Sequence, residues 1–345
     1  MSAPPAFKTG VSYYGCRIPW RAREDLEAIA RNHCTFVVHT FSEEDREFYV
    51  EAMRQIVADS KALGLEVWLD PWAVGQAFGG ETYSALVMKR RDLCQVSSTG
   101  ETLPSACPNH PEFQAYLKGW AATAVEIGAQ VLFWDEPHFY IVPEDGTSGA
   151  THWACRCAAC QARYVERYGH PMPVTMTPEV RAFKEDSLVA FLTLLCDEGR
   201  RLGARNAMCY LPFENSSTFT DWAKVAAIPS VDIIGTDPYW RPHQQDVAAY
   251  VGRAARRIQT LAQTHKKEGQ IWILNFNIKR GEEPKITEAI DAVVAAGIRN
   301  VAAWSYYGAS YISLASDDPP AVWATLGKAY AHEQGAAGDP GPKWR

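Results

Sequence analysis

Short runs rich in Val, Ile, Phe, Tyr and Trp recur along the chain, and each is followed by a longer amphipathic segment. This alternation is typical of parallel sheets, because helices then cover strands that are buried on both faces. The eight runs lie at residues 10–15, 35–41, 66–72, 130–137, 206–213, 231–240, 270–278 and 300–308. The pattern predicts a (β/α)8 TIM barrel, with a doubly wound open sheet as the alternative. No glycine-rich phosphate-binding motif follows a run, which argues against a nucleotide-binding sheet.

The length of 345 residues, with 47% hydrophobic content, suits one barrel domain. We expect residues 1–334 to form this single catalytic domain and residues 335–345 to be a flexible C-terminal tail. The stretches 73–109 and 138–177 are too long for simple connections. They predict long loops after the third and fourth strands, on the face where barrel enzymes carry their active sites.

The composition indicates which classes of binding partner to expect. The net charge is -6 and no Lys/Arg-rich run is present, so neither nucleic acid nor an acidic membrane surface is an expected partner. No signal peptide and no window long and apolar enough to cross a bilayer can be recognised, which favours a cytoplasmic protein. The 12 Trp and 15 Tyr residues suit a carbohydrate substrate, whose C–H faces stack on aromatic rings. The oligomeric state is not indicated.

The stretch VLFWDEPHFY, at residues 131–140, breaks from an apolar strand into two adjacent carboxylates. Cleavage of a glycosidic bond needs a proton donor and a second group at the sugar, and we assign the donor role to Glu136. The charge of Asp135 and the apolar residues before it favour the protonated form of Glu136. Asp237, in GTDPYW, or Asp135 is the second catalytic carboxylate that we expect. Alternatively, the pair belongs to a surface turn.

The predicted ends of the other strands are polar or aromatic as well. In (β/α)8 barrels these ends converge on one site, so we expect them to bind the substrate. The predicted substrate-binding residues are Tyr14, His39, Asp70, Trp72, His138, Tyr210, Glu214, Tyr239, Trp240, Asn275, Trp304 and Tyr306.

Cys155, Cys157 and Cys160 form a C-x-C-x2-C motif in the long loop after the fourth strand. Thiolates at such short spacing suit a tetrahedral zinc ion, which needs a fourth ligand. We expect Cys107, in the loop after the third strand, to complete a structural zinc site, with Cys94 or His152 as alternatives. Three free thiols or a redox site would give the same spacing. No organic cofactor is expected.

The segment from Cys107 to Gly169 resembles the family 42 β-galactosidases, which are glycoside hydrolases with (β/α)8 catalytic domains. The resemblance rests on SACPNHPEF around Cys107, on Glu136, and on CRCAACQARYVERYG beyond it. It implies that the four cysteines hold zinc and that Glu136 is the acid/base catalyst. The chain departs from the family at two places. Asp135 stands where the family has Asn, and the predicted seventh strand ends near Asn275 instead of at a nucleophilic glutamate.

Three further hypotheses are considered, and the first two follow from these departures. The Asp135–Glu136 pair also looks like that of the family 20 and family 123 hexosaminidases, in which the substrate's acetamido oxygen is the nucleophile and the Asp orients it. A barrel that binds carbohydrate without cleaving it would explain the absence of an acid on the seventh strand. A hydrolase with a catalytic metal at His39, Asp70 and His138 ranks last, because no close metal-binding motif supports it.

Overall fold

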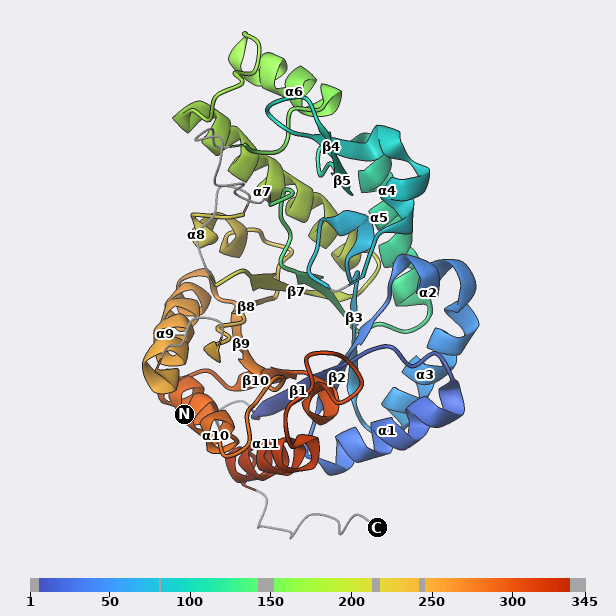
Figure 1. Cartoon of the computed structure of the whole chain (residues 1–345), viewed down its shortest axis with the longest axis vertical. Coiled ribbons are helices and arrows are strands. Elements are labelled where there is room, and N and C mark those ends of the chain that lie inside the picture. Colours follow the sequence, from blue (N-terminus) through green and yellow to red (C-terminus); the bar gives the residue numbers. More distant parts are fainter. Residues whose placement is uncertain (1–5, 81, 142–151, 213–217, 242–245, 336–345) are drawn as a thin grey trace.

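The computed structural model describes residues 6–80, 82–141, 152–212, 218–241 and 246–335. Within this part of the chain, eight parallel strands close into a barrel, in the order β1-β10-β9-β8-β7-β6-β3-β2 (Figure 1). The barrel strands are β1 (Lys8–Tyr13), β2 (Phe36–Thr40), β3 (Glu66–Asp70), β6 (Val131–Asp135), β7 (Arg205–Tyr210), β8 (Ile233–Thr236), β9 (Glu268–Leu274) and β10 (Asn300–Trp304). Each of the eight predicted strands is present, and the predicted TIM barrel is confirmed.

Helices follow the strands, and most of them form the outer ring of the barrel, whereas α4 and α6 belong to segments that extend from it (Figure 1). They are α1 (Pro19–Arg31), α2 (Glu43–Phe48), α3 (Val50–Ala62), α4 (Ala85–Lys89), α5 (Pro111–Glu126), α6 (Ala158–Tyr168), α7 (Pro178–Arg201), α8 (Trp222–Ala226), α9 (Val247–His265), α10 (Pro284–Ala295) and α11 (Pro319–Glu333), with short 3-10 helices η1 (Val74–Gln76), η2 (Arg91–Leu93) and η4 (Tyr306–Ala309). None of the helices in the described ranges is long and apolar enough to cross a bilayer.

Alternate residues of each strand face opposite sides of the barrel wall, so two separate cores form. One core lies inside the barrel and is built from Phe36, Val38, Trp68, Val131, Phe133, Ala207, Cys209, Ile233, Trp272 and Ala302. The larger core lies between the strands and the helices and includes Trp134. Gly10 of β1 leaves room for the inner core, since a Cβ there would come within 2.1 Å of the Phe36 ring. Phe36 in turn stacks on Trp68, with ring centroids 4.6 Å apart.

The predicted long loops after the third and fourth strands are confirmed. The first insertion runs from β3 to α5 and contains an antiparallel hairpin of β4 (Cys94–Val96) and β5 (Thr102–Ala106). The second insertion follows β6 and contains α6, and the two extend together from one side of the barrel (Figure 1). An isolated bridge between Ser97 and Ala154 joins them. Residues 336–345 of the predicted tail lie outside the described residues, and the predicted domain division stays a prediction.

Candidate active site

A cavity of about 400 Å³ opens at the carboxyl ends of the barrel strands, a volume within the usual range of small-molecule sites. Its lining combines acidic and aromatic side chains. The acidic residues are Asp70, Asp135, Glu136 and Asp237, and the aromatic ones are Trp72, Phe133, Tyr239, Trp272, Phe276 and Trp304. Seven of the predicted catalytic and substrate-binding residues therefore meet in one place: Asp70, Trp72, Asp135, Glu136, Asp237, Tyr239 and Trp304.

The three predicted catalytic carboxyls come from two strands of the barrel. Asp135 is the last residue of β6, and Glu136 follows it with a φ of 41°, a left-handed conformation that is uncommon outside glycine. Asp237 follows β8 directly and is buried, with 6% of its surface exposed. Both Asp237 and Glu136 line the cavity, and the buried Oδ1 atom of Asp237 has no hydrogen-bond partner among the described residues. Burial, followed by the charge of Glu136, raises the pKa of Asp237 well above its usual value, which favours its protonated form.

The first insertion passes directly over the carboxyl pair of β6. The backbone N–H of Gly79 donates to the carbonyl oxygen of Asp135 at 3.1 Å. A Cβ at Gly79 would lie 2.5 Å from Oδ2 of Asp135 and 3.1 Å from Oε2 of Glu136. Glycine at this position leaves the two carboxyls in place, whereas any side chain would force one of these groups to move.

Sequence reasoning missed Cys209 as a residue of the site. Cys209 pairs in register with Asp135 across β6 and β7, and its side chain lines the cavity. Burial raises the pKa of its thiol, and the neighbouring carboxyls of Asp237, Asp135 and Glu136 act in the same direction. The thiol contacts the carbonyl oxygen of Tyr210 at 3.9 Å. Strand alternation was the available signal, because Cys209 is two residues beyond Ala207, which also belongs to the inner core.

Ser12, Val38, Thr40 and the inner aromatic residues Phe133, Trp272 and Phe276 are further lining residues that the sequence analysis did not name. Phe133 and Trp272 pack with ring centroids 5.1 Å apart, and Phe276 meets Trp304 edge-on at 4.7 Å. Together they give the cavity an apolar wall of packed aromatic rings beside its acidic residues.

His39 and Tyr210 lie on the outer side of the barrel wall, away from the cavity. The ring of His39 is buried and lies 2.9 Å from the hydroxyl of Ser60 in α3. Burial lowers the pKa of His39 to about 3, so the ring is neutral at physiological pH. Tyr210 stacks on Trp222 and donates to its carbonyl oxygen at 3.0 Å. Both residues therefore pack the barrel against its helices.

Three other predicted residues also lie outside the cavity lining. Trp240 is buried in the core between strands and helices, and Asn275 is buried with its amide donating to the carbonyl oxygen of Ser305 at 2.8 Å. The ring of His138 contacts the carbonyl oxygen of Glu136 at 2.6 Å, behind the carboxyl pair. Glu214 lies outside the described residues.

Tyr14 and Tyr306 border a neighbouring hollow instead of the cavity itself. Tyr14 stacks on Trp304 at a centroid distance of 5.7 Å and also contacts Trp72 at 4.8 Å. Tyr306 donates its hydroxyl to Asp25 at 2.9 Å. The two tyrosines are thus close to the cavity but outside its lining.

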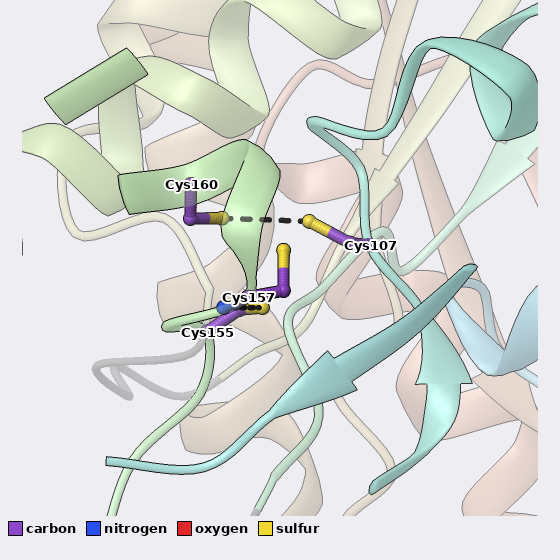
Figure 2. Close-up of side chains that lie close together, drawn as sticks. All are labelled: Cys107, Cys155, Cys157 and Cys160. Carbon is purple, nitrogen blue, oxygen red and sulfur yellow. Dashed lines mark hydrogen bonds between the residues drawn. The ribbon is translucent and has the colours of Figure 1, made fainter. Parts of the chain in front are cut away.

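The four cysteines Cys107, Cys155, Cys157 and Cys160 form one buried cluster between the two insertions (Figure 2). Their sulfur atoms all lie within 4.8 Å of one another. Cys107 joins the other three, whereas the thiol of Cys94 contacts the carbonyl oxygen of Val87 and His152 contacts Thr99. Within the described residues, this is the one group of three or more His, Cys, Asp or Glu side chains placed to share a metal ion. The alternative metal site at His39, Asp70 and His138 does not form.

Nearby donors suit a cluster of thiolates. The backbone N–H of Val96 and that of Cys157 donate to the sulfur of Cys155 at 3.4 and 3.3 Å, and the Asn109 amide donates to the sulfur of Cys160 at 3.3 Å. Such hydrogen bonds stabilise negative charge on sulfur. The residues present therefore fit a soft divalent cation such as zinc.

A buried ammonium group gives a second indication of negative charge at the cluster. Lys184 of α7 is only 1% exposed, and its Nζ atom has no hydrogen-bond partner among the described residues. It lies over the rings of Phe139 and Trp153, at 5.4 and 5.6 Å from their centroids. Burial lowers the pKa of Lys184 to about 7, while the charges of Cys155 and Cys160 act in the opposite direction. Four thiolates around a divalent cation carry two net negative charges, which this ammonium would partly offset.

The fold and the cavity together define a (β/α)8 barrel with an acidic, aromatic pocket at the carboxyl ends of its strands. No protein-family model matches the chain, and no curated protein matches it. Solved structures do share the fold. The catalytic domain of the β-amylase from Paenibacillus polymyxa has a TM-score of 0.64 and 10% identity, covering 88% of this chain and 93% of that one.

The endo-1,4-β-mannanase from Rhizomucor miehei has a TM-score of 0.65 and 8% identity, covering 96% of this chain and 97% of that one. The D-allulose 3-epimerase from Methylomonas sp. has a TM-score of 0.51 and 11% identity, covering 96% and 100%. At such low identities the likeness concerns the fold alone.

Proposed function

We propose that the chain is a glycoside hydrolase in which Glu136 donates a proton to the oxygen of the bond that is cleaved. The observation that carries this proposal is that Glu136 and the buried Asp237 line one cavity that is walled by aromatic rings. Two carboxyls in one cavity can supply the acid and the second group that glycosidic cleavage needs. The similarity to a β-amylase and an endo-1,4-β-mannanase supports the same class of reaction.

In the proposed reaction, the proton of Glu136 passes to the leaving oxygen as the bond between that oxygen and the anomeric carbon breaks. Water supplies the hydroxyl group to the anomeric carbon, and its remaining proton returns to Glu136. Asp237 or Asp135 is the second carboxylate; Asp135, or Asp237 once it has lost its proton, stabilises the positive charge that develops on the sugar ring. The wall formed by Trp304 and Phe276 holds the ring through its C–H face.

The proposed second carboxylate is Asp237, directly after β8, or Asp135, at the end of β6. It is not expected after β9. β9 ends at Leu274 and is followed by Asn275, whose buried amide is bonded to the backbone. The glutamate that ends the seventh strand in family 42 β-galactosidases therefore has no counterpart at this position. The resemblance to that family stays a prediction.

Turnover of nitrophenyl glycosides tests the proposal. A panel that contains hexosides, pentosides and N-acetylhexosaminides identifies the sugar and detects a requirement for an acetamido group. Glu136→Gln should then lower kcat/KM by about 10²–10⁴-fold, the usual contribution of general acid–base catalysis. Glu288→Gln, at an exposed position of α10, is the matched control and should leave turnover unchanged.

Full activity of the Glu136→Gln variant would refute the proposal. Sugar-dependent melting shifts without any product would instead indicate a barrel that binds carbohydrate without cleaving it. Interconversion of free ketoses without glycoside cleavage would indicate an epimerase.

The cysteine cluster is proposed to hold a structural zinc ion that ties the two insertions together. Its four buried sulfur atoms and the donors around them support this role. Metal analysis of the purified protein should give about one zinc ion per chain, the occupancy of a single four-thiolate site. All nine cysteines are free, which supports a cytoplasmic, reducing location.

A further inference from the structure

A hollow of about 930 Å³, which we call the aromatic groove, adjoins the cavity at the ends of β1 and β10. Tyrosine side chains dominate its lining, and Trp72 borders both the groove and the cavity. The residues that define the groove are Tyr14, Trp72, Tyr306, Tyr307, Tyr311 and Ile312. Tyr311 is 42% exposed, so part of this surface is open to solvent.

Aromatic rings connect the cavity with the groove without interruption. Phe276 and Trp304 of the cavity are 4.7 Å apart, and Trp304 stacks on Tyr14 at 5.7 Å with an angle of 18° between the ring planes. Tyr14 contacts both Trp72 and Tyr311, at 4.8 and 5.2 Å. A ligand that extends from the cavity into the groove would meet Trp304 in the cavity, Trp72 where the two hollows join, and Tyr311 in the groove. A chain of sugar rings matches this surface, because each ring offers a C–H face for stacking.

The charges around this path favour an uncharged ligand. The cavity lining contains four acidic side chains and, among the described residues, no basic one. Arg17 is the cationic residue of the groove, but it is already paired with Asp45 at 2.6 Å and with Glu44 at 2.8 Å. Asp25 is likewise engaged by the hydroxyls of Tyr13 and Tyr306. A uronic acid or a sulfated sugar would therefore meet negative charge without a compensating cation.

We propose that the aromatic groove is a second sugar-binding site, and that the substrate is a neutral oligosaccharide whose chain runs from the cavity into the groove. This inference rests on the proposed glycoside hydrolase function, and it defines the substrate class of that site. Tyr311 is the clearest groove residue to vary, because its ring lies outside the cavity lining and is partly exposed.

Chain-length dependence tests the groove. The substrates are nitrophenyl manno-, cello- and xylo-oligosaccharides of one to three sugars. We expect kcat/KM to rise about tenfold when the chain becomes long enough for a sugar to enter the groove, because one aromatic contact contributes about this much. Tyr311→Ala should remove this rise, and Tyr311→Phe, which keeps the ring, should retain it. Trp20→Ala is the control, since Trp20 is 72% exposed and lies outside the groove lining. Oligogalacturonides should be cleaved poorly or not at all.

The outcomes separate this inference from the proposed function. Two results would refute the second sugar-binding site but not the glycoside hydrolase function. One is hydrolysis of a monosaccharide glycoside with no rise in kcat/KM for longer chains. The other is the same rise in kcat/KM in the Tyr311→Ala variant. If no glycoside is hydrolysed, the groove can still be tested by binding. The affinity of the trisaccharide for the Glu136→Gln variant is then measured by tryptophan fluorescence. The trisaccharide should bind about tenfold more tightly than the monosaccharide, a difference that Tyr311→Ala removes. Equal affinities would refute the inference.

Discussion

Replacing Gly79 by alanine tests whether the carboxyls that follow β6 perform the chemistry. Gly79 is in the insertion after β3 and does not itself carry a reactive group. Its new methyl group would lie 2.5 Å from Oδ2 of Asp135 and 3.1 Å from Oε2 of Glu136. The substitution therefore acts on the two carboxyls and leaves their chemical identity unchanged.

The size of the effect follows from the contact distances. Ordinary van der Waals contact begins at 3.4 Å, so the Asp135 oxygen must move by about 0.9 Å from its 2.5 Å position. The backbone hydrogen bond between Gly79 and Asp135 holds the two segments together, so the insertion cannot simply retreat. A misplacement of about 1 Å typically costs about 10²-fold in rate, or roughly 2.7 kcal/mol of transition-state stabilisation. We expect a loss of this size in kcat/KM.

The assay is the hydrolysis of the best nitrophenyl glycoside, combined with thermal melting to show that the variant is folded. Gly252→Ala is the matched control. It also adds one methyl group at a buried glycine, but the nearest atom is the flexible end of Arg256 at 3.2 Å, in α9 and away from the cavity. The control should retain full activity. Wild-type kcat/KM in folded Gly79→Ala protein would refute the assignment of the reaction to these carboxyls.

Three further predictions concern charge and metal. Burial and the charge of Glu136 raise the pKa of Asp237 in the folded protein. Protonated Asp237 therefore contributes fully to stability at pH values below the ordinary carboxyl pKa. This contribution is lost as the pH rises through the raised pKa. Asp237→Asn should therefore melt higher than wild type at pH 8 and about equally near pH 4; an equal difference at both pH values would contradict this. Cys157→Ser should reduce bound zinc and lower the melting temperature, whereas Cys94→Ser, outside the cluster, should keep the metal. The Lys184→Met variant should release zinc to a chelator at least about tenfold faster than wild type, because the negative charge of the cysteine cluster would lose its buried ammonium partner. Unchanged release would show that Lys184 has only a packing role.

The fold could be predicted from the sequence because the strands have a strong local signal. Several, such as β2 (FVVHT) and β6 (VLFWD), are short runs rich in β-branched and aromatic residues, and helical segments alternate with the strands. Asp135, Glu136 and Asp237 could also be brought together, because parallel strands in a barrel place their carboxyl ends at one face. The cysteine cluster followed from spacing and from the adjacency of two long loops.

The direction of individual side chains was harder to predict. His39 and Tyr210 are at strand ends, but each points outward, while Val38, Thr40 and Cys209 point inward. Strand alternation contains this information, but only once the inward register of each strand is known. That register depends on how the eight strands pair, which is a property of the whole barrel and not of any one run.

Asp135 and Trp134 are neighbours in the chain, yet one faces the cavity and the other packs against the helices. The barrel wall thereby separates the positions that line the cavity from those that pack against the helices. A directed-evolution library limited to cavity-lining positions such as Thr40 and Asp70 would alter the cavity and leave the packing between strands and helices in place. The same architecture explains how one scaffold can diversify in specificity while its outer shell stays intact.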